Sequence, residues 1–395
     1  MKDSWNQTKV KPKKQKRNIK AIVIVSILSI IIGLLIATII LYLNNEDAKN
    51  WIDKNILGKE IEQANAVSIE IDDENAKICA FNQNIGILSK NSFNIYDSNG
   101  KQEKTLNIEV TTPVFDTENK FLTIAEDGGQ KAYLISDKDI LWEKNIEGNI
   151  SQIHVNNNGY VAIVVTNTSY KTVIEMYSPK GEELFKTYLS TTRVSDATIS
   201  NDNKYLAIAE IDTSGTMIQS STKIISIEKA KSDPTNSIEK IYNAQSNKLL
   251  TKIKYQDNNR LVNMFTDSIT EIEDGEENQV IDNSNKKVSF ASVDLSNNVV
   301  TLEEKSSGLF TADSVLNITN TTTKETKEYT ADEVSKEIYT KGDIIALNLG
   351  SEIDFINTNG WLVKKYLANQ EVSSLALSNS IAGIVYRDKV EIIKF

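Results

Sequence analysis

Residues 174–189 read IEMYSPKGEELFKTYL, two stretches of alternating apolar and polar residues joined by a turn at Gly181. Alternation with a period of two is typical of a β-strand with one buried face, and tight hairpin turns need a residue that tolerates positive φ. The same pattern recurs in FNIYDSNGKQEKTL (93–106), in IDFINTNGWLVKKYL (353–367) and, with Asp139 in place of the glycine, in YLISDKDILWEKNI (133–146). These segments predict a hairpin that repeats along the chain.

Each hairpin is preceded by a second recurring pattern, which consists of a short strand, a polar turn and a hydrophobic strand. Clear copies are PVFDTENKFLTIAE (113–126), IHVNNNGYVAIVV (153–165), ATISNDNKYLAIAE (197–210), SVDLSNNVVTL (292–302) and LALSNSIAGIVY (375–386), with weaker ones near 79–88, 253–265 and 338–349. The two patterns together form a four-stranded unit with a step of about 40 to 50 residues, which is the period of a β-propeller. A pair of β-sandwich domains also has many short strands but lacks such a regular step.

The repeat count favours eight blades, with seven as the alternative because the fourth unit (195–247) and the sixth unit (289–336) are long and irregular. Seven units are complete, whereas the last one ends at Phe395 without its fourth strand. The spare strand AVSIEI (66–71) precedes the first unit, and we expect it to pair with residues 389–395 and close the ring, which removes exposed sheet edges. The side chains expected to form this closure are Val67, Ile69 and Ile71 on one strand and Val390, Ile392 and Phe395 on the other.

An uninterrupted apolar run, AIVIVSILSIIIGLLIATIILYL, occupies residues 21–43. As a helix it would reach about 34 Å, enough for the roughly 30 Å hydrocarbon core of a bilayer. Basic residues precede it, and those expected to set the topology are Lys11, Lys13, Lys14, Lys16, Arg17 and Lys20. The positive-inside rule then leaves the N-terminus in the cytoplasm and the bulk of the chain outside. The run is too long for a cleavable signal peptide, and no cysteine follows it to carry a lipid.

The sequence therefore predicts four regions: a basic cytoplasmic tail (1–20), a transmembrane helix (21–43), a juxtamembrane linker with a short helix (44–65) and an all-β ectodomain (66–395). Ser29, Gly33 and Ala37 are four residues apart and share one face of the predicted transmembrane helix. Such a row of small residues allows a second helix to approach closely, so a transmembrane homodimer or pairing with another membrane protein is a candidate partnership. In the linker, Trp51 is expected at the membrane interface.

Charge narrows the range of partners. Of the 44 basic and 54 acidic residues, eight basic and one acidic residue precede position 44, which leaves the remainder with 36 and 53 and a formal charge of −17. An acidic surface of this size repels nucleic acid and anionic lipid headgroups. Cys79 is the only cysteine, so no intrachain disulfide forms, and the Asn-, Lys- and Ile-rich composition indicates an exported bacterial protein.

The segment YLISDKDILWEKNIEGNI (133–150) is similar to a repeat of quinoprotein-like and tryptophan-aspartate-type propellers, with Trp142 at the docking position. Thr105, Phe185 and Val363 occupy or neighbour that position in other units. With its basic tail, single anchor and acidic ectodomain, the whole chain resembles a family of membrane-anchored propellers of unknown function from Gram-positive, clostridia-like bacteria. This resemblance implies a fold and a location but no chemistry.

No candidate site carries a recognisable chemistry. A quinoprotein dehydrogenase would need a cofactor cage and often a vicinal cysteine pair, so no cofactor is expected and Trp142 is interpreted as a packing residue between blades. His154 is the only histidine, which excludes a histidine-based metal cluster, and it is interpreted as a structural or surface residue. The acidic turns at 72–74, 97–100 and 273–277 do not match the 12-residue calcium loop, and they are interpreted as solvated hairpin tips.

Three functional hypotheses remain. The first is a non-enzymatic binding or scaffold protein of the cell envelope, whose partners are the membrane and other envelope proteins but no nucleic acid. The second is a sensor that signals through its basic tail, although residues 1–20 contain no output domain. The third is a hydrolase or lyase acting on wall material, which would need two placed carboxylates at the channel mouth.

Overall fold

The computed structural model describes residues 19–44, 48, 52, 65–245, 247–256, 260–306, 308 and 312–395. For residues 19–26 and 44 it describes the backbone alone. Contacts divide the chain into two units, residues Met1–Glu60 and Ile61–Phe395. The basic residues Lys11 to Arg17 and Trp51 lie outside the described residues, and so does the side chain of Lys20. Of the short helix predicted in the linker, only Ala48 and Ile52 are described, and both are helical.

The first unit contains helix α1 (Ile19–Asn44), whose 26 residues include the whole apolar run. Side chains at Ser29, Gly33 and Ala37 are exposed on α1, and a Cβ added to Gly33 would meet nothing within 4 Å. The helix pairing predicted for this row stays a prediction. Over the side chains that the structure describes, no helix is both long enough and apolar enough to cross a membrane.

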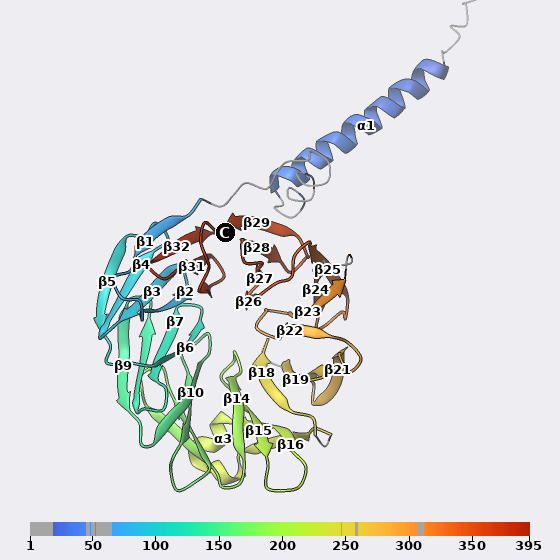
Figure 1. The fold of residues 1–395 in the computed structure, drawn as a ribbon. Helices are drawn as coiled ribbons and strands as arrows, with labels where there is room; N and C mark the ends of the chain where they lie inside the picture. The colour runs from blue at the N-terminus through green and yellow to red at the C-terminus, as the bar shows by residue number, and fades with distance from the viewer. Residues whose placement is uncertain are drawn as a thin grey trace, which may run out of the picture. The chain divides into compact units, whose positions relative to one another are not determined.

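The second unit is an eight-bladed β-propeller, with each blade a four-stranded antiparallel sheet (Figure 1). Blades 1 to 4 consist of β2 (Lys77–Phe81), β3 (Asn84–Ser89), β4 (Ser92–Asp97) and β5 (Gln102–Asn107); β6 (Pro113–Glu118), β7 (Phe121–Glu126), β8 (Lys131–Ser136) and β9 (Asp139–Asn145); β10 (Asn149–Val155), β11 (Val161–Thr166), β12 (Thr172–Tyr177) and β13 (Glu183–Leu189); and β14 (Arg193–Ile199), β15 (Tyr205–Asp212), β16 (Gln219–Ser226) and β17 (Ile238–Asn243).

Blades 5 to 8 consist of β18 (Leu250–Tyr255), β19 (Leu261–Phe265), β20 (Ser268–Glu273) and β21 (Glu276–Asp282); β22 (Val288–Ser292), β23 (Asn298–Ser306), β24 (Ala312–Asn320) and β25 (Thr326–Ala331); β26 (Glu337–Lys341), β27 (Ile344–Asn348), β28 (Glu352–Asn357) and β29 (Leu362–Leu367); and β30 (Ser374–Leu377), β31 (Ile381–Val385), β32 (Lys389–Lys394) and β1 (Val67–Glu70). The predicted eight-bladed propeller is confirmed, and the alternatives of seven blades or two sandwiches are wrong.

The eighth blade combines the two ends of the propeller segment. Strand β1, blue in Figure 1, pairs antiparallel with β32, in red, so that Val67 is opposite Ile392 and Ile69 is opposite Val390. Just beyond β1, the amide of Ile71 donates to the carbonyl of Asp388 at 2.7 Å. Phe395 follows β32, and its ring centroid lies 5.0 Å from that of Phe355 in blade 7.

The two irregular units contain insertions within complete blades. In blade 4, helix α3 (Ile227–Ser232) and the short 3₁₀ helix η1 (Pro234–Asn236) lie between β16 and β17. The side chain of Ser226 caps α3 by accepting from the amide of Lys229, and Ile227 and Ala230 are buried. In blade 6, β23 and β24 are extended to nine residues each. The added residues lengthen a connection in blade 4 and two strands in blade 6, and neither blade loses a strand.

The hairpin turns adopt the conformation that the glycines predicted. Gly100, Gly181 and Gly360 have φ of +74°, +80° and +77°. In blade 2, however, the residue with positive φ is Asp137, at +54°, whereas Asp139 already begins β9. The prediction placed this position two residues too late, and an aspartate accepts it because its short polar side chain tolerates the left-handed region.

Neighbouring blades pack through apolar faces, and the middle strands are buried on both sides, as in β11 (VAIVVT). Trp142 on β9 is 8 % exposed and packs with residues of blade 3, its ring centroid 5.9 Å from that of Tyr177. A Cβ on Gly181 would lie 3.0 Å from the Trp142 ring, so the turn glycine allows the indole to dock. The interpretation of Trp142 as an inter-blade packing residue is confirmed.

Candidate functional site

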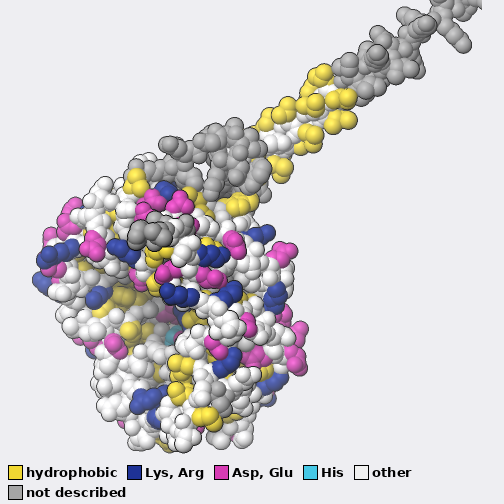
Figure 2. Space-filling view, turned by 45° about the vertical axis from the view of Figure 1, so that its right-hand side comes forward, with side chains coloured by type: hydrophobic (Ala, Val, Ile, Leu, Met, Phe, Trp, Pro, Cys, Tyr) yellow, Lys and Arg dark blue, Asp and Glu magenta, His cyan; other side chains and the backbone are white. Residues whose placement is uncertain are grey.

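Charged side chains from several blades lie in the central channel of the propeller. The first strand of each blade is the innermost one, and its alternate residues face the channel. The polar residues Asp116 and Glu118 alternate on β6, and Lys252 and Lys254 alternate on β18. The space-filling view shows a face that is hollowed near its middle and carries interspersed charges of both signs (Figure 2).

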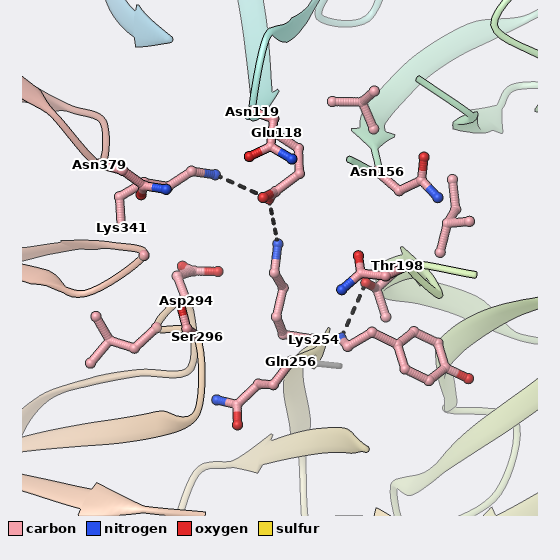
Figure 3. A pocket seen from close by; sticks show the side chains of 16 residues that line it. Glu118, Asn119, Asn156, Thr198, Lys254, Gln256, Asp294, Ser296, Lys341 and Asn379 are labelled. Atoms are coloured by element: carbon pink, nitrogen blue, oxygen red, sulfur yellow. Dashed lines mark hydrogen bonds and ion pairs between the residues drawn. The ribbon is translucent and has the colours of Figure 1, made fainter. Parts of the chain in front are cut away.

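One end of the channel holds a cavity of about 190 Å³ to which seven of the eight blades contribute (Figure 3). Its neutral polar side chains are Asn119, Asn156, Thr198, Asn201, Tyr255, Gln256, Ser296 and Asn379. At its centre, Glu118 Oε2 accepts from Lys254 Nζ at 3.1 Å and from Lys341 Nζ at 3.4 Å. Lys341 also donates to the carbonyl of Thr117. We call Glu118, Lys254 and Lys341 the channel ion cluster.

Several of the neutral side chains in this cavity are already bonded within the protein. The Asn156 side chain accepts from the amides of Asn158 and Tyr160 and donates to the carbonyl of Ser200. Gln256 donates to the carbonyl of Asn298 and accepts from the hydroxyl of Thr321. These amides stabilise the turns that follow the innermost strands.

A second cavity of about 230 Å³ lies deeper in the channel and shares Lys254 and Asp294 with the first. Here Lys252 forms an ion pair with Asp294, which follows β22. Asp196 on β14 accepts from the amide of Ile253 at 2.9 Å, and its other carboxylate oxygen lies 3.6 Å from His154 Nε2. These contacts connect the first strands of neighbouring blades to one another.

The charges in the channel hold one another in their ionised forms. Burial works against the charge of Lys254, but the carboxylates of Glu118, Asp294 and Asp116 outweigh it and raise the pKa of this lysine. Burial likewise opposes the ionisation of Glu118, and Lys254 and Lys341 overcome it, so that the pKa of Glu118 is lowered. The pKa of Asp294 is lowered in the same way, chiefly by Lys252. General acid–base catalysis needs groups whose pKa lies near the working pH, and these shifts move the groups away from it.

Asp196 is the exception among the channel carboxyls. Its side chain is 12 % exposed, and burial raises its pKa despite the attraction of His154. Besides Asp196, His154 Nε2 contacts the Gln152 side-chain oxygen at 3.2 Å. The only histidine therefore lies in the channel wall with two polar neighbours, a position that its strand assignment alone could not indicate.

The remaining residues singled out in the sequence are distributed through the fold. Cys79 is buried on β2, and burial raises the pKa of its thiol, which makes it a poor nucleophile. In the turn at 97–100, the Asp97 carboxylate accepts from the amides of Asn99 and Lys101 at 2.8 and 2.9 Å, so it supports its own hairpin. Within the described part of the chain, no group of three or more His, Cys, Asp or Glu residues is placed to hold a metal ion.

The channel ion cluster was not predicted from the sequence. Glu118, Lys254 and Lys341 occur in three separate repeat units. The sequence around each of them predicts only a strand position that faces solvent. The sequence offers one indication of the cluster, which is the position of its members: a charged residue recurs at the end of the first strand in the second, fifth and seventh units.

Comparison with known proteins supports the fold. The model of a family described as Family of unknown function (DUF5711) matches residues 23–395. No curated protein sequence matches the chain significantly.

Among solved structures, BamB from Moraxella catarrhalis is 13 % identical over 85 % of this chain and 100 % of BamB, with a TM-score of 0.53. Sqt1 from Chaetomium thermophilum, solved bound to the N-terminus of the ribosomal protein L10, is 9 % identical over 85 % of this chain and 100 % of its own, with a TM-score of 0.52. The dihydro-heme d1 dehydrogenase NirN, in complex with DHE, is 10 % identical over 86 % and 74 %, with a TM-score of 0.50. At these identities the likeness concerns the fold alone.

Proposed function

We propose that this chain, which belongs to the DUF5711 family of unknown function, is a membrane-anchored scaffold that binds another protein of the bacterial cell envelope. The observation that carries this proposal is the mutual neutralisation of the channel charges. Glu118 is shared by two lysines, and Lys252 is paired with Asp294. With these groups engaged in holding blades together, the exposed faces and rims of the ring are left as the surfaces for recognition.

The fold is suited to this role because a propeller presents loops from every blade on two broad faces. Sqt1, which shares the fold, was solved with a segment of another protein bound. Propellers host many unrelated functions, so this parallel supports a binding role without identifying the partner.

The anchoring part of the proposal rests on the sequence. The apolar run at residues 21–43 contains no charged side chain, and eight basic residues precede it against one acid. A helix of that composition is long enough to span a bilayer with its N-terminus in the cytoplasm. The full-length chain should fractionate with membranes and resist carbonate extraction, and external protease should remove the propeller from intact protoplasts. A chain that carbonate releases, or a propeller that only lysis exposes, would contradict this placement.

The hydrolase alternative would need a carboxylic acid of raised pKa beside a free carboxylate. Asp196 meets the first condition through burial. Glu118 and Asp294 are both paired with lysines, however, and the pKa of each is lowered. The ion pairs therefore favour binding over hydrolysis.

Crosslinking in intact cells tests the scaffold role. We expect the full-length chain to capture one or a few specific envelope proteins, identified by mass spectrometry, and a version restricted to residues 1–65 to lose them. The same set of proteins captured by both versions would show that the propeller contributes no recognition and would overturn the proposal.

A further inference from the structure

A groove beside blade 3 combines exposed aromatic rings with a carboxylate for which the described residues provide no partner. Its volume is about 470 Å³, and its lining includes Glu147, Gly148, Tyr170, Glu175, Lys186 and Tyr188. We call it the tyrosine groove. Glu147 and Gly148 belong to the connection between blades 2 and 3, and Tyr170 belongs to the loop between β11 and β12.

Strand register brings the groove together. Val173 on β12 is opposite Tyr188 on β13, and Glu175 is opposite Lys186 two residues further along the same face. This face of blade 3 packs against blade 2, as the clustering of Val173 with Trp142 shows. The groove is therefore the outer continuation of the interface between these two blades.

Two tyrosine rings lie at the surface of the groove. Tyr170 and Tyr188 are 42 % and 53 % exposed, and their ring centroids are 4.7 Å apart at an interplanar angle of 44°. Tyrosine at a surface offers a large amphipathic contact with few rotatable bonds, and its ring face carries a negative electrostatic potential. Exposed aromatic pairs of this kind attract cations as well as apolar groups.

The charges around the rings leave an acid in excess. Glu147 is exposed, and none of the described residues forms a hydrogen bond or ion pair with its side chain. Glu175 and Glu183 share Lys186, at 2.7 and 3.5 Å from its Nζ. The neighbouring ammonium of Lys144 lies 5.1 Å from the centre of the Tyr177 ring. Within the lining of the groove itself, the two carboxylates of Glu147 and Glu175 face the one ammonium group of Lys186.

A third lysine, Lys171, adjoins Tyr170 but is engaged on the side of blade 4. Its Nζ donates to the carbonyl of Thr191 at 2.9 Å, and it also interacts with the Asp212 carboxylate. It therefore leaves the negative balance of the groove in place. The contact of Lys144 with Tyr177 shows that this interface already accommodates a cation over a tyrosine ring.

We propose that the tyrosine groove binds an arginine side chain of the partner protein, with the guanidinium against the rings of Tyr170 and Tyr188 and Glu147 as its counter-ion. The proposal rests on the proposed scaffold function and names the chemistry of its partner. Arginine fits better than lysine because its planar guanidinium stacks on an aromatic ring while donating hydrogen bonds to a carboxylate. The acidic charge of the chain outside the anchor would also draw a basic segment towards it.

The test uses the full-length chain in detergent micelles with ¹³C-labelled tyrosine rings, and Tyr170→Phe and Tyr188→Phe assign the two signals. The probe is the peptide acetyl-Arg-Gly-Arg-amide, compared with its citrulline analogue, which keeps the shape and removes the charge. We expect the arginine peptide to shift both signals saturably and the citrulline peptide to need about tenfold higher concentration. Glu147→Gln should weaken the arginine peptide about fivefold, whereas Glu325→Gln, at an exposed turn of blade 6, should leave it unchanged.

Three results would overturn the inference: no shift at Tyr170 and Tyr188, equal binding of the citrulline peptide, or shifts produced instead by a neutral glycan such as chitotetraose. Repeating the cellular crosslinking with Tyr188→Ala separates the two proposals. Undiminished capture of the partner by Tyr188→Ala, with no peptide shift, would refute the groove and leave the scaffold function standing. If the unmodified chain captures no protein beyond those captured by residues 1–65, the scaffold function itself is refuted.

Discussion

Lys254 Nζ lies 3.1 Å from Glu118 Oε2 in the central channel, although the two residues are 136 positions apart and belong to blades 5 and 2. Lys341 of blade 7 completes the contact. Most propeller contacts join consecutive blades, whereas this cluster joins three blades that are not neighbours. Its side chains are only 20–27 % exposed, so solvent screens their attraction less than that of a surface pair.

Replacing Glu118 with glutamine should destabilise the propeller by about 2 kcal/mol, because two partly buried lysines lose their shared counter-charge. Urea unfolding of the full-length chain, followed by circular dichroism, would measure this. The matched control is Asp139→Asn, which removes an exposed ion pair with Lys104, at 44 % and 73 % side-chain exposure, and should cost less than about 0.5 kcal/mol. Equal losses in the two variants would show that the channel ion cluster contributes no more than a surface pair.

The same cluster predicts a pH dependence. The pKa of Glu118 in the folded chain lies below its usual value of 4.5, so its stabilisation is complete above that pH and is lost as the pH falls through the folded value. The pKa of Lys254 lies above 10.5, so its contribution is complete below that pH and is lost as the pH rises through the folded value. Unfolding free energies of the unmodified chain and of Glu118→Gln should therefore differ most between about pH 5 and 10 and converge in acid. A constant difference down to pH 3 would contradict the assignment.

Gly181→Ala should destabilise the interface between blades 2 and 3. An added Cβ would lie 3.0–3.1 Å from the Trp142 ring, and the residue would also keep a φ of +80°. Gly128→Ala separates these two costs, because Gly128 has a φ of +69° and open space around its Cβ position. We expect a loss of about 1 kcal/mol for Gly128→Ala and about 2 kcal/mol for Gly181→Ala in thermal or urea unfolding. Similar losses would mean that the Trp142 ring moves aside without cost.

Ile69→Ala should weaken ring closure. Ile69 on β1 is 7 % exposed and packs with residues of blades 1 and 8, so truncation leaves a cavity and should cost about 3 kcal/mol. Ser68→Ala on the exposed side of the same strand should change stability by less than about 0.5 kcal/mol. Hydrogen exchange of the β32 amides would show whether the loss acts at the closure. Unchanged protection of β32 in Ile69→Ala would argue against it.

Much of the architecture was predictable because its determinants are local. The turn glycines at 100, 181 and 360 and the alternation of the strands on either side are visible in short segments, and their recurrence establishes the blade. Trp142 could be interpreted as a packing residue because a large aromatic side chain on an outer strand is buried most readily against the neighbouring blade. The misplaced turn residue in blade 2 shows the limit, since either aspartate of Ser136–Asp139 could take the positive φ and only the hairpin register selects Asp137.

The channel ion cluster, the tyrosine groove and the surroundings of His154 were harder to predict from the sequence. A glutamate, two lysines or two tyrosines on different strands look like ordinary solvent-facing residues until the strands are placed side by side. His154 was expected to be a structural or surface residue, and its contact with Asp196 depends on where blades 3 and 4 meet at the channel.

By itself, the sequence determined the eight-unit repeat, the hairpin turns and the strand available for closure, because each depends on residues within a few positions of one another. Only the tertiary structure decided which charges meet in the channel and which rings share the tyrosine groove. Coulomb and ring contacts act over a few ångströms in space, and ring closure brings Glu118, Lys254 and Lys341 within that range regardless of their separation along the chain.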